Sequence, residues 1–252
     1  MAMRECLNLT GIPTTREGIY ATNNQFQKAG PKGFHNVKVL NNNNLYVRVD
    51  LPGVPDNGVR HRIDAVRKKL VFFSGETPDD GNTKDGVREY SGSAGLGCDC
   101  CEITDVDAKM KDGVLRLIVS RVKVKDHDKK CTNTVPPNAC QTGRHLEDHP
   151  FVVKGRKRAF VGAALPGDGV YFAVDIPGVC GEDVEVFANE HTVKFYAEVK
   201  NVYEHDESGR VYLGCVNSRS SSSDPLPSIL TQKIAYEAEF GVLKIVIAPR
   251  SS

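Results

Sequence analysis

The sequence of 252 residues contains no apolar run near the roughly 18–20 residues that a membrane-spanning helix requires. It also has almost no excess of charge, because 33 lysines and arginines face 32 aspartates and glutamates, for a net charge of +1. A chain so balanced offers no field that would attract nucleic acid or an anionic membrane, so we expect neither as a partner. Its first residues lack the charged start and apolar core of a secretory signal. We therefore expect residence in the cytoplasm, with the nucleus as an alternative.

The motifs of common enzyme and metal sites are also missing. The cysteines at Cys98, Cys100 and Cys101 have no second pair of ligands at the spacing of a structural zinc site. The glycine-rich residues 92–97 lack the ending of a phosphate-binding loop. We predict a non-enzymatic protein with no catalytic residue, no metal ion and no cofactor, and with reduced thiols in its eight cysteines. A metal site, or a redox role for the thiols, stays an alternative. Residues that could complete such a metal site only by coincidence of folding are His127, Cys131 and Cys140.

What the sequence does contain is an internal duplication. Residues 45–54 (LYVRVDLPGV) match residues 170–179 (VYFAVDIPGV). Two more matches follow in the same order, of residues 88–92 with 210–214 and of residues 113–119 with 241–247. The three offsets are 125, 122 and 128 residues, so the copies differ only in loop length. This pattern predicts a duplicated domain.

Each copy has the pattern of short β-strands. Residues 46–51 alternate apolar and charged side chains before a Pro-Gly turn, as a half-buried strand does. Residues 59–63, 70–73 and 184–188 continue the pattern. The pair Asp112-Gly113 before the last strand of the first copy indicates a tight hairpin. The predicted fold is therefore all-β, with two tandem antiparallel β-sandwiches of immunoglobulin-like design.

Composition divides the chain into four parts. Residues 1–34 are rich in Gly, Asn, Thr and Gln and are expected to be a flexible tail. Residues 126–150 are polar and interrupted by prolines, which is typical of a linker. The two domains are accordingly predicted at residues 35–125 and 151–252.

The ordered motifs of the first copy resemble the alpha-crystallin domain of small heat shock proteins. The resemblance rests on residues 49–54 (VDLPGV), 88–92 (REYSG) and 108–115 (AKMKDGVL). The start and the last strand of the second copy are similar too, although residues 238–241 (AEFG) indicate an altered final turn. Two such domains in one chain resemble the tandem plant members of the family, the large heat shock proteins. The resemblance implies that both sandwiches are of the alpha-crystallin type.

The resemblance implies an ATP-independent chaperone, a holdase that binds exposed apolar segments of unfolding proteins during the stress response. In the family, the binding groove lies between two strands that correspond here to residues 59–63 with 106–110, and 184–188 with 234–238. The implied groove residues are Val59, Ile63, Met110, Val184, Val186 and Ile234. Each is equally well explained as a core residue, because alternate strand residues usually are. The alternative function is an adaptor or co-chaperone that binds specific protein partners, as in a nuclear regulatory complex.

Two departures from the family pattern bear on assembly. The sequence stops at residue 252, directly after the last strand and without the isoleucine-x-isoleucine tail that anchors large assemblies of the family. The loops at residues 77–87 and 199–209 are short for the strand that plant and bacterial members exchange on dimerisation. We therefore expect the two copies to pair within one chain, as a monomer or a small oligomer.

Overall fold

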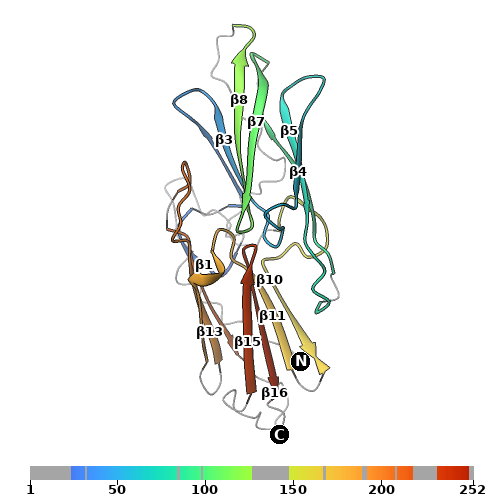
Figure 1. The fold of residues 1–252 in the computed structure, drawn as a ribbon, viewed down its shortest axis with the longest axis vertical. Helices are drawn as coiled ribbons and strands as arrows, with labels where there is room; N and C mark the ends of the chain where they lie inside the picture. The colour runs from blue at the N-terminus through green and yellow to red at the C-terminus, as the bar shows by residue number, and fades with distance from the viewer. Residues whose placement is uncertain are drawn as a thin grey trace.

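The computed structural model of the protein describes residues 24–31, 33–83, 86–97, 99–126, 148–166, 169–188, 192–207, 209–217 and 232–249. These residues form two antiparallel β-sandwiches, each of two four-stranded sheets, placed end to end (Figure 1). The first sandwich consists mainly of the first copy, and the second mainly of the second copy. The predicted all-β fold of two tandem sandwiches is confirmed. In the parts of the chain described here, no helix has the length and apolar character needed to cross a membrane.

The first sandwich encloses its own hydrophobic core between two sheets. One sheet contains, in spatial order, β2 (His35–Val39), β3 (Leu45–Asp50), β8 (Val114–Lys123) and β7 (Cys101–Lys111). The other contains β4 (Val59–Ile63), β5 (Leu70–Glu76), β6 (Glu89–Gly95) and β9 (Val152–Lys154). Large side chains that are fully buried here include Leu45, Leu51, Tyr90, Ile103, Leu115 and Leu117.

The second sandwich repeats this arrangement around a separate core. One sheet contains β10 (Phe160–Leu165), β11 (Gly169–Asp175), β16 (Val242–Pro249) and β15 (Gln232–Glu239). The other contains β1 (Gln27–Ala29), β14 (Val211–Asn217), β13 (Thr192–Glu198) and β12 (Val184–Ala188). A 3-10 turn, η3 (Gly181–Asp183), leads into β12. The fully buried large side chains of the second sandwich include Phe172, Ile176, Phe195 and Tyr212.

Local sequence explains the bounds of two strands completely. The strands β4 and β12 begin and end at the residues that alternation and the flanking turns predict. The strand β3 is different, because all six of its residues are buried, including Arg48 and Asp50. An alternating strand of an antiparallel sheet normally leaves its charged face in water. Another part of the chain must therefore cover that face of β3.

Each sandwich is completed by a strand that precedes the other copy. The strand β1 comes before β2 in sequence but pairs with β14, where Gln27 lies opposite Tyr212. The strand β9 comes before β10 but pairs with β6. In sequence, β1 lies within the expected tail (1–34), and β9 starts directly after the expected linker (126–150). This reciprocal exchange ties the two sandwiches together.

The last hairpins of the two copies turn in the same way. Asp112 and Gly113 have φ angles of +50° and +71°, and Phe240 and Gly241 have +50° and +69°. Two successive residues at positive φ form the tight turn that suits an antiparallel hairpin. The altered final turn expected at residues 238–241 was wrong, because Phe240 adopts the left-handed conformation that Asp112 has in the first copy.

The two hairpin tips meet at the middle of the molecule (Figure 1). The Gly178 amide donates to the Asp112 carbonyl over 2.8 Å, and the Gly53 amide donates to the Phe240 carbonyl over 2.8 Å. Each tip is therefore hydrogen-bonded to the Pro-Gly turn of the other copy. A Cβ atom on Gly241 would lie 2.5 Å from the Asp112 carbonyl oxygen, so this contact has no space for a side chain.

Gly241→Ala is expected to destabilise the protein more than Gly81→Ala does. Both glycines have positive φ, at +69° and +65°, but a Cβ on Gly81 would meet nothing within 4 Å. Gly81→Ala should therefore cost only the left-handed strain, about 1–2 kcal/mol. Gly241→Ala should cost about 1–3 kcal/mol more for the crowding at the hairpin tip. Urea denaturation measures both, and equal costs would contradict close contact between the tips.

Candidate functional site

Each sandwich has one side on which edge strands of its two sheets come together. In the first sandwich these are β4 and β7, which are in contact. In the second they are β12 and β15, and η3 packs against β15 just before β12 begins. These four strands are the ones on which the resemblance implies a client groove. We call the two places edge 1 (β4 and β7) and edge 2 (β12 and β15).

The residues implied as groove residues lie on these edges at different depths. Met110 and Val184 are only 8% and 6% exposed and belong to the two cores. The other four pack partly buried against the same cores, and they are Val59, Ile63, Val186 and Ile234. Of the six, these four therefore present apolar surface at the edges.

Tyr236 is a further apolar side chain at edge 2 that the sequence reasoning did not single out. It shares one face of β15 with Ile234 and Ala238, since alternate strand residues point to the same side. The residue is nevertheless 51% exposed, because β15 is the outermost strand of its sheet. At edge 1 the residue of β4 that shares a face with Val59 and Ile63 is His61, and it is exposed. Alternation along β15 is the signal that could have found Tyr236.

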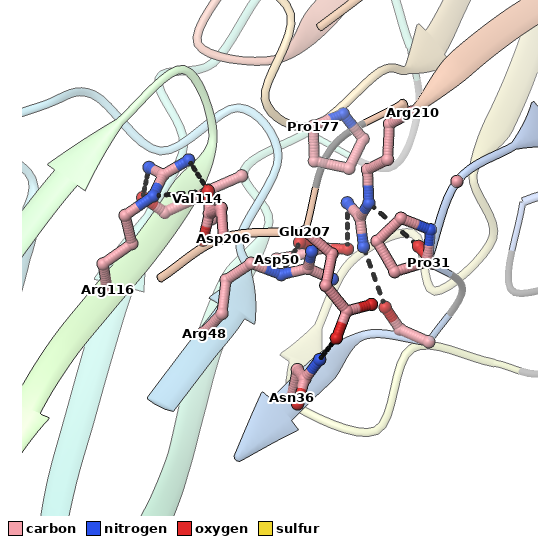
Figure 2. Close-up of polar contacts among 12 residues, drawn as sticks. Pro31, Asn36, Arg48, Asp50, Val114, Arg116, Pro177, Asp206, Glu207 and Arg210 are labelled. Atoms are coloured by element: carbon pink, nitrogen blue, oxygen red, sulfur yellow. Dashed lines mark hydrogen bonds and ion pairs between the residues drawn. The ribbon is translucent and has the colours of Figure 1, made fainter. Parts of the chain in front are cut away.

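Two buried ion pairs connect the copies, one in each direction. Arg88 of the first copy donates from both terminal nitrogens to the Asp175 carboxylate of the second, each over 3.1 Å. Arg210 of the second copy donates to the Asp50 carboxylate of the first over 2.9 Å (Figure 2). The two aspartates hold the same position in the repeated motif, as do the two arginines. The copies therefore make the same interaction with each other twice.

A tyrosine two residues after each arginine extends these pairs. Arg88 donates to the Tyr90 hydroxyl over 2.5 Å, and that hydroxyl donates to the Pro52 carbonyl over 2.8 Å. In the second copy the Tyr212 hydroxyl donates to the Pro177 carbonyl over 2.9 Å. Burial raises the pKa of Tyr212 to about 12, so the hydroxyl stays a neutral donor. Each arginine is thus linked through its tyrosine to the Pro-Gly turn of its own copy.

The surroundings of the arginines decide their ionisation. Burial alone lowers the pKa of a guanidinium because it disfavours the charged form. For Arg88 and Arg210 the facing aspartates more than offset burial and raise the pKa. Arg156 gives Asp175 a second partner at 2.8 Å, although burial lowers the pKa of Arg156 itself. The Asp175 carboxylate therefore faces two arginines, of which Arg88 is buried and Arg156 is partly buried.

Arg48 marks a difference between the copies, since Ala173 stands at its position in the second. Its Nε atom lies 3.7 Å from the Asp50 carboxylate, beyond hydrogen-bond distance. Within the described part of the chain, the Nε and Nη2 atoms of this buried side chain have no hydrogen-bond partner. Burial accordingly lowers the pKa of Arg48.

The loop before β14 crosses from the second copy onto the charged face of β3 and its neighbours. The Asp206 carboxylate accepts hydrogen bonds from Arg116 over 3.0 and 2.8 Å, and another from the Tyr46 hydroxyl (Figure 2). Glu207 pairs with Lys38 of β2 over 3.0 Å. These contacts explain why β3 is buried on both faces.

The corresponding loop of the first copy crosses in the opposite direction. The Tyr171 hydroxyl, at the position of Tyr46 in the repeat, donates to Asp80 over 2.6 Å. As far as the two loops are described, neither contributes a strand to the other copy. Each of these short loops instead places one carboxylate, Asp206 or Asp80, on the tyrosine of the facing copy.

His149 is a buried side chain that holds the segment around β9 on the first copy. Its Nε2 atom donates to the Asp50 carbonyl over 2.7 Å, and its Nδ1 atom accepts from the Phe151 amide over 3.3 Å. This arrangement needs the neutral ring, with its hydrogen on Nε2. Burial, with the Arg88 charge nearby, lowers the pKa of His149 to about 4.

Asn24 has the same role in the segment around β1. Its side-chain amide donates to the Asp175 carbonyl over 2.5 Å, and its side-chain carbonyl accepts from the Phe26 amide over 3.0 Å. Asparagine and neutral histidine each offer one donor and one acceptor. The equivalent positions of Asn24 and His149 therefore require a side chain with one donor and one acceptor, and two residue types meet this requirement.

The cysteine cluster of the sequence is only partly described. Cys100 and Cys101 are buried, and their Sγ atoms lie 3.5 Å apart. Cys98 and the residues suggested as further metal ligands, His127, Cys131 and Cys140, lie outside the described residues. Among the residues that are described, no three histidine, cysteine, aspartate or glutamate side chains are grouped to hold a metal ion.

Asp175→Asn is expected to lower the free energy of unfolding by roughly 3–5 kcal/mol, because it leaves the buried Arg88 and the partly buried Arg156 without their counter-charge. Urea denaturation followed by circular dichroism measures the loss. The control is Glu89→Gln, the same change from carboxylate to amide in an exposed ion pair with Lys154. That change should not move the unfolding midpoint measurably. Equal effects would contradict the dominance of the buried pair.

His149→Asn is expected to remove part of the acid sensitivity. An unfolded histidine takes up a proton near pH 6.5, whereas folded His149 does so only near pH 4. Stability from the neutral ring is thus complete above pH 6.5 and is lost as the pH falls toward 4. Between pH 7 and pH 4.5 the wild type should lose about 2 kcal/mol more than His149→Asn.

The substituted asparagine can make the two hydrogen bonds that Asn24 makes, but it lacks the ring that packs on Phe34 and Tyr90, so stability at pH 7 should fall and the comparison uses the change of each protein between the two pH values. Chemical denaturation of both proteins at the two pH values gives the comparison. Parallel pH dependence in the two proteins would show that His149 is not the group responsible.

Comparison with known proteins supplies the family. A family model described as "Predicted plant small heat shock protein" matches residues 6–250. The chain is 40% identical over 118 residues to the "Putative 57 kDa heat shock protein" of Arabidopsis thaliana. It is 29% identical over 79 residues to the "Heat shock 22 kDa protein, mitochondrial" of Glycine max. These matches cover 46% and 31% of this chain, and 22% and 36% of the two relatives.

The family match includes both sandwiches and nearly the whole chain, so it confirms the resemblance that the ordered motifs indicated. The relatives are covered over only about a fifth and about a third of their own length. The chain therefore belongs to the family of plant small heat shock proteins that the matching model describes.

Proposed function

We propose that the protein is an ATP-independent holdase of the small-heat-shock type, which binds exposed apolar segments of unfolding proteins. The observation that carries the proposal is the family match over residues 6–250. The structure supports it with partly exposed apolar side chains on edge strands of both copies, among them Tyr236, which is 51% exposed. Binding of this kind involves no chemical turnover.

Edge strands suit this task for a physical reason. An unfolding chain exposes apolar surface and unpaired backbone groups, both of which drive aggregation. An edge strand offers free backbone donors and acceptors, and its neighbouring side chains offer apolar contact. In each sandwich the exchanged strand lies at the opposite side of its sheet from β4 or β12. The pairing of the copies therefore leaves both edges available to a client.

The proposed partners are unfolding client proteins in the cytoplasm, with the nucleus as the alternative compartment. The reciprocal ion pairs and exchanged strands join two copies of one chain. They support a monomer whose copies pair within the molecule, or a small oligomer of such units.

The purified protein is expected to suppress the heat-induced aggregation of a model client followed by turbidity. Tyr236→Ser should raise the amount needed for half-maximal suppression roughly fivefold, the factor for about 1 kcal/mol of lost apolar contact. The control is Val39→Ser, which removes an apolar side chain of similar exposure, 55% against 51%, from the outer strand β2. It should suppress aggregation as well as the wild type does.

An unchanged turbidity trace at equimolar wild-type protein would contradict the holdase function. If a pull-down then recovers one stoichiometric folded partner, the adaptor function replaces it. Equal losses for the two serine variants would place client binding somewhere other than edge 2.

A further inference from the structure

Two short segments of the chain dock on equivalent sites in the same way. Residues 24–30 (NQFQKAG) precede the first copy and dock on the second, and residues 149–155 (HPFVVKG) precede the second copy and dock on the first. They share a residue with one donor and one acceptor, a phenylalanine two positions later, and a glycine four positions after that. Each of the other four positions differs between the segments.

The phenylalanine is the apolar anchor of each segment. Phe151 enters the first core edge-to-face on Phe73, with ring centres 5.2 Å apart. Gly92 makes room for both rings, since a Cβ there would lie 2.5 Å from each of them. In the second core, Phe26 packs on Phe195 with ring centres 5.5 Å apart, and Gly214 is crowded by both rings in the same way.

Backbone and polar contacts fix the direction of each segment. The Ser91 amide donates to the Phe151 carbonyl over 2.8 Å, and the Leu213 amide donates to the Phe26 carbonyl over 2.9 Å. Two residues before each phenylalanine, the His149 or Asn24 side chain donates to a carbonyl of the host sandwich. These are contacts to the edge strand and to backbone groups, so they do not depend on the four positions that differ.

The glycine closes the pattern at the other end. Gly155 has a φ of +86°, and a Cβ on it would lie 2.8 Å from the Val87 carbonyl oxygen. Gly30 has a φ of +82°, and a Cβ there would lie 2.6 Å from the Arg210 backbone. A side chain at this position would therefore meet strain and backbone atoms of the host in both copies.

We propose that the outer edge of β6, and likewise that of β14, is a binding site for an extended polypeptide segment with this pattern. The ligand class is Asn or His, then Phe two residues later, then Gly four residues after the Phe. The chain's own segments fill both sites at rest, and client segments of the same pattern enter when the copies separate. This inference rests on the proposed holdase function and adds a second type of client site, distinct from edges 1 and 2.

Several features make this a recognition site and not only part of a core. Neither segment is adjacent in sequence to the strand it joins: β9 pairs with β6, and β1 pairs with β14. Two segments with different sequences at four of seven positions bind in the same pose, so the three shared positions define what the site selects. The residues around the anchor, Gly92 and Phe73, belong to the host sandwich alone.

The test uses the full chain and a fluorescein-labelled peptide of residues 148–157. In the wild type the tethered segment competes at an effective concentration on the order of a millimolar, so micromolar peptide should bind weakly. Phe151→Ala removes the anchor of that competitor and should tighten peptide binding by at least about tenfold, read by fluorescence anisotropy. Peptides that carry Phe151→Ala or Gly155→Val should not bind, and these controls leave the protein itself unchanged.

Should Phe151→Ala lose its β-sheet circular dichroism, the wild type provides the second measurement. A peptide with a photo-crosslinking phenylalanine analogue at the anchor position, used at millimolar concentration, should label β5 or β6 near Phe73 and Gly92, located by mass spectrometry. Labelling only elsewhere on the chain would overturn the proposal. So would equal binding of the peptide to wild type and Phe151→Ala, or binding that ignores the phenylalanine and the glycine.

This inference and the holdase function fail separately. If the wild type suppresses aggregation but the peptide does not bind, the β6 and β14 site is refuted and the holdase function stands. If the peptide binds with the expected pattern but aggregation is unaffected, the site stands and the holdase function is refuted.

Discussion

Burial of charge between the two copies constrains most of the molecule. A guanidinium without a partner in a protein interior is strongly destabilising, so Arg88 is tolerated there only because Asp175 of the other copy faces it. The same holds for Arg210 and Asp50. Since both pairs run from one copy to the other, Arg88 and Arg210 each take their counter-charge from the facing copy. The exchanged strands make the apolar cores depend on both copies as well. Each core contains a phenylalanine from the segment that precedes the other copy.

The two copies have diverged around this shared interface. Asn24 and His149 make equivalent hydrogen bonds, but only histidine can take up a proton between pH 4 and pH 7. Arg48 has no counterpart in the second copy, and its Nε atom lies 3.7 Å from Asp50, whereas the second arginine at Asp175, Arg156, is hydrogen-bonded to it over 2.8 Å. The duplication therefore gives similar backbones with unequal electrostatics.

Strand exchange also decides which edges remain open. In the sheets that contain β6 and β14, the borrowed strands β9 and β1 cover one edge and leave β4 and β12 at the other. An uncovered edge strand tends to pair with other chains, and proteins usually limit this tendency with charge or shape. Three consecutive exposed residues, Arg60, His61 and Arg62, have that effect on β4. The proposed client binding and the charge that limits self-association therefore fall on the same strand.

Local sequence by itself determined the duplication and several of the strands. Residues 59–63 and 184–188 were predicted to the residue, since alternation of apolar and polar side chains and a flanking turn are short-range signals. The six candidate residues were placed on the correct strands, but alternation cannot separate a core position such as Met110 from an edge position such as Ile63. Both lie on strands that are outermost in their sheets, so the difference depends on what the rest of the fold packs against each position.

Only the tertiary structure decided how the copies join. The strands β1 and β9 are three residues each, too short for a periodic signal, and their partners lie in the other copy. The ion pair of Arg88 and Asp175 joins residues 87 positions apart, and the local sequence around one residue does not indicate the other as its partner. Pairing across such separations is set by how whole sandwiches fit together. The sequence determined two similar sandwiches, and the burial of their charges and phenylalanines against each other decided that they form one unit.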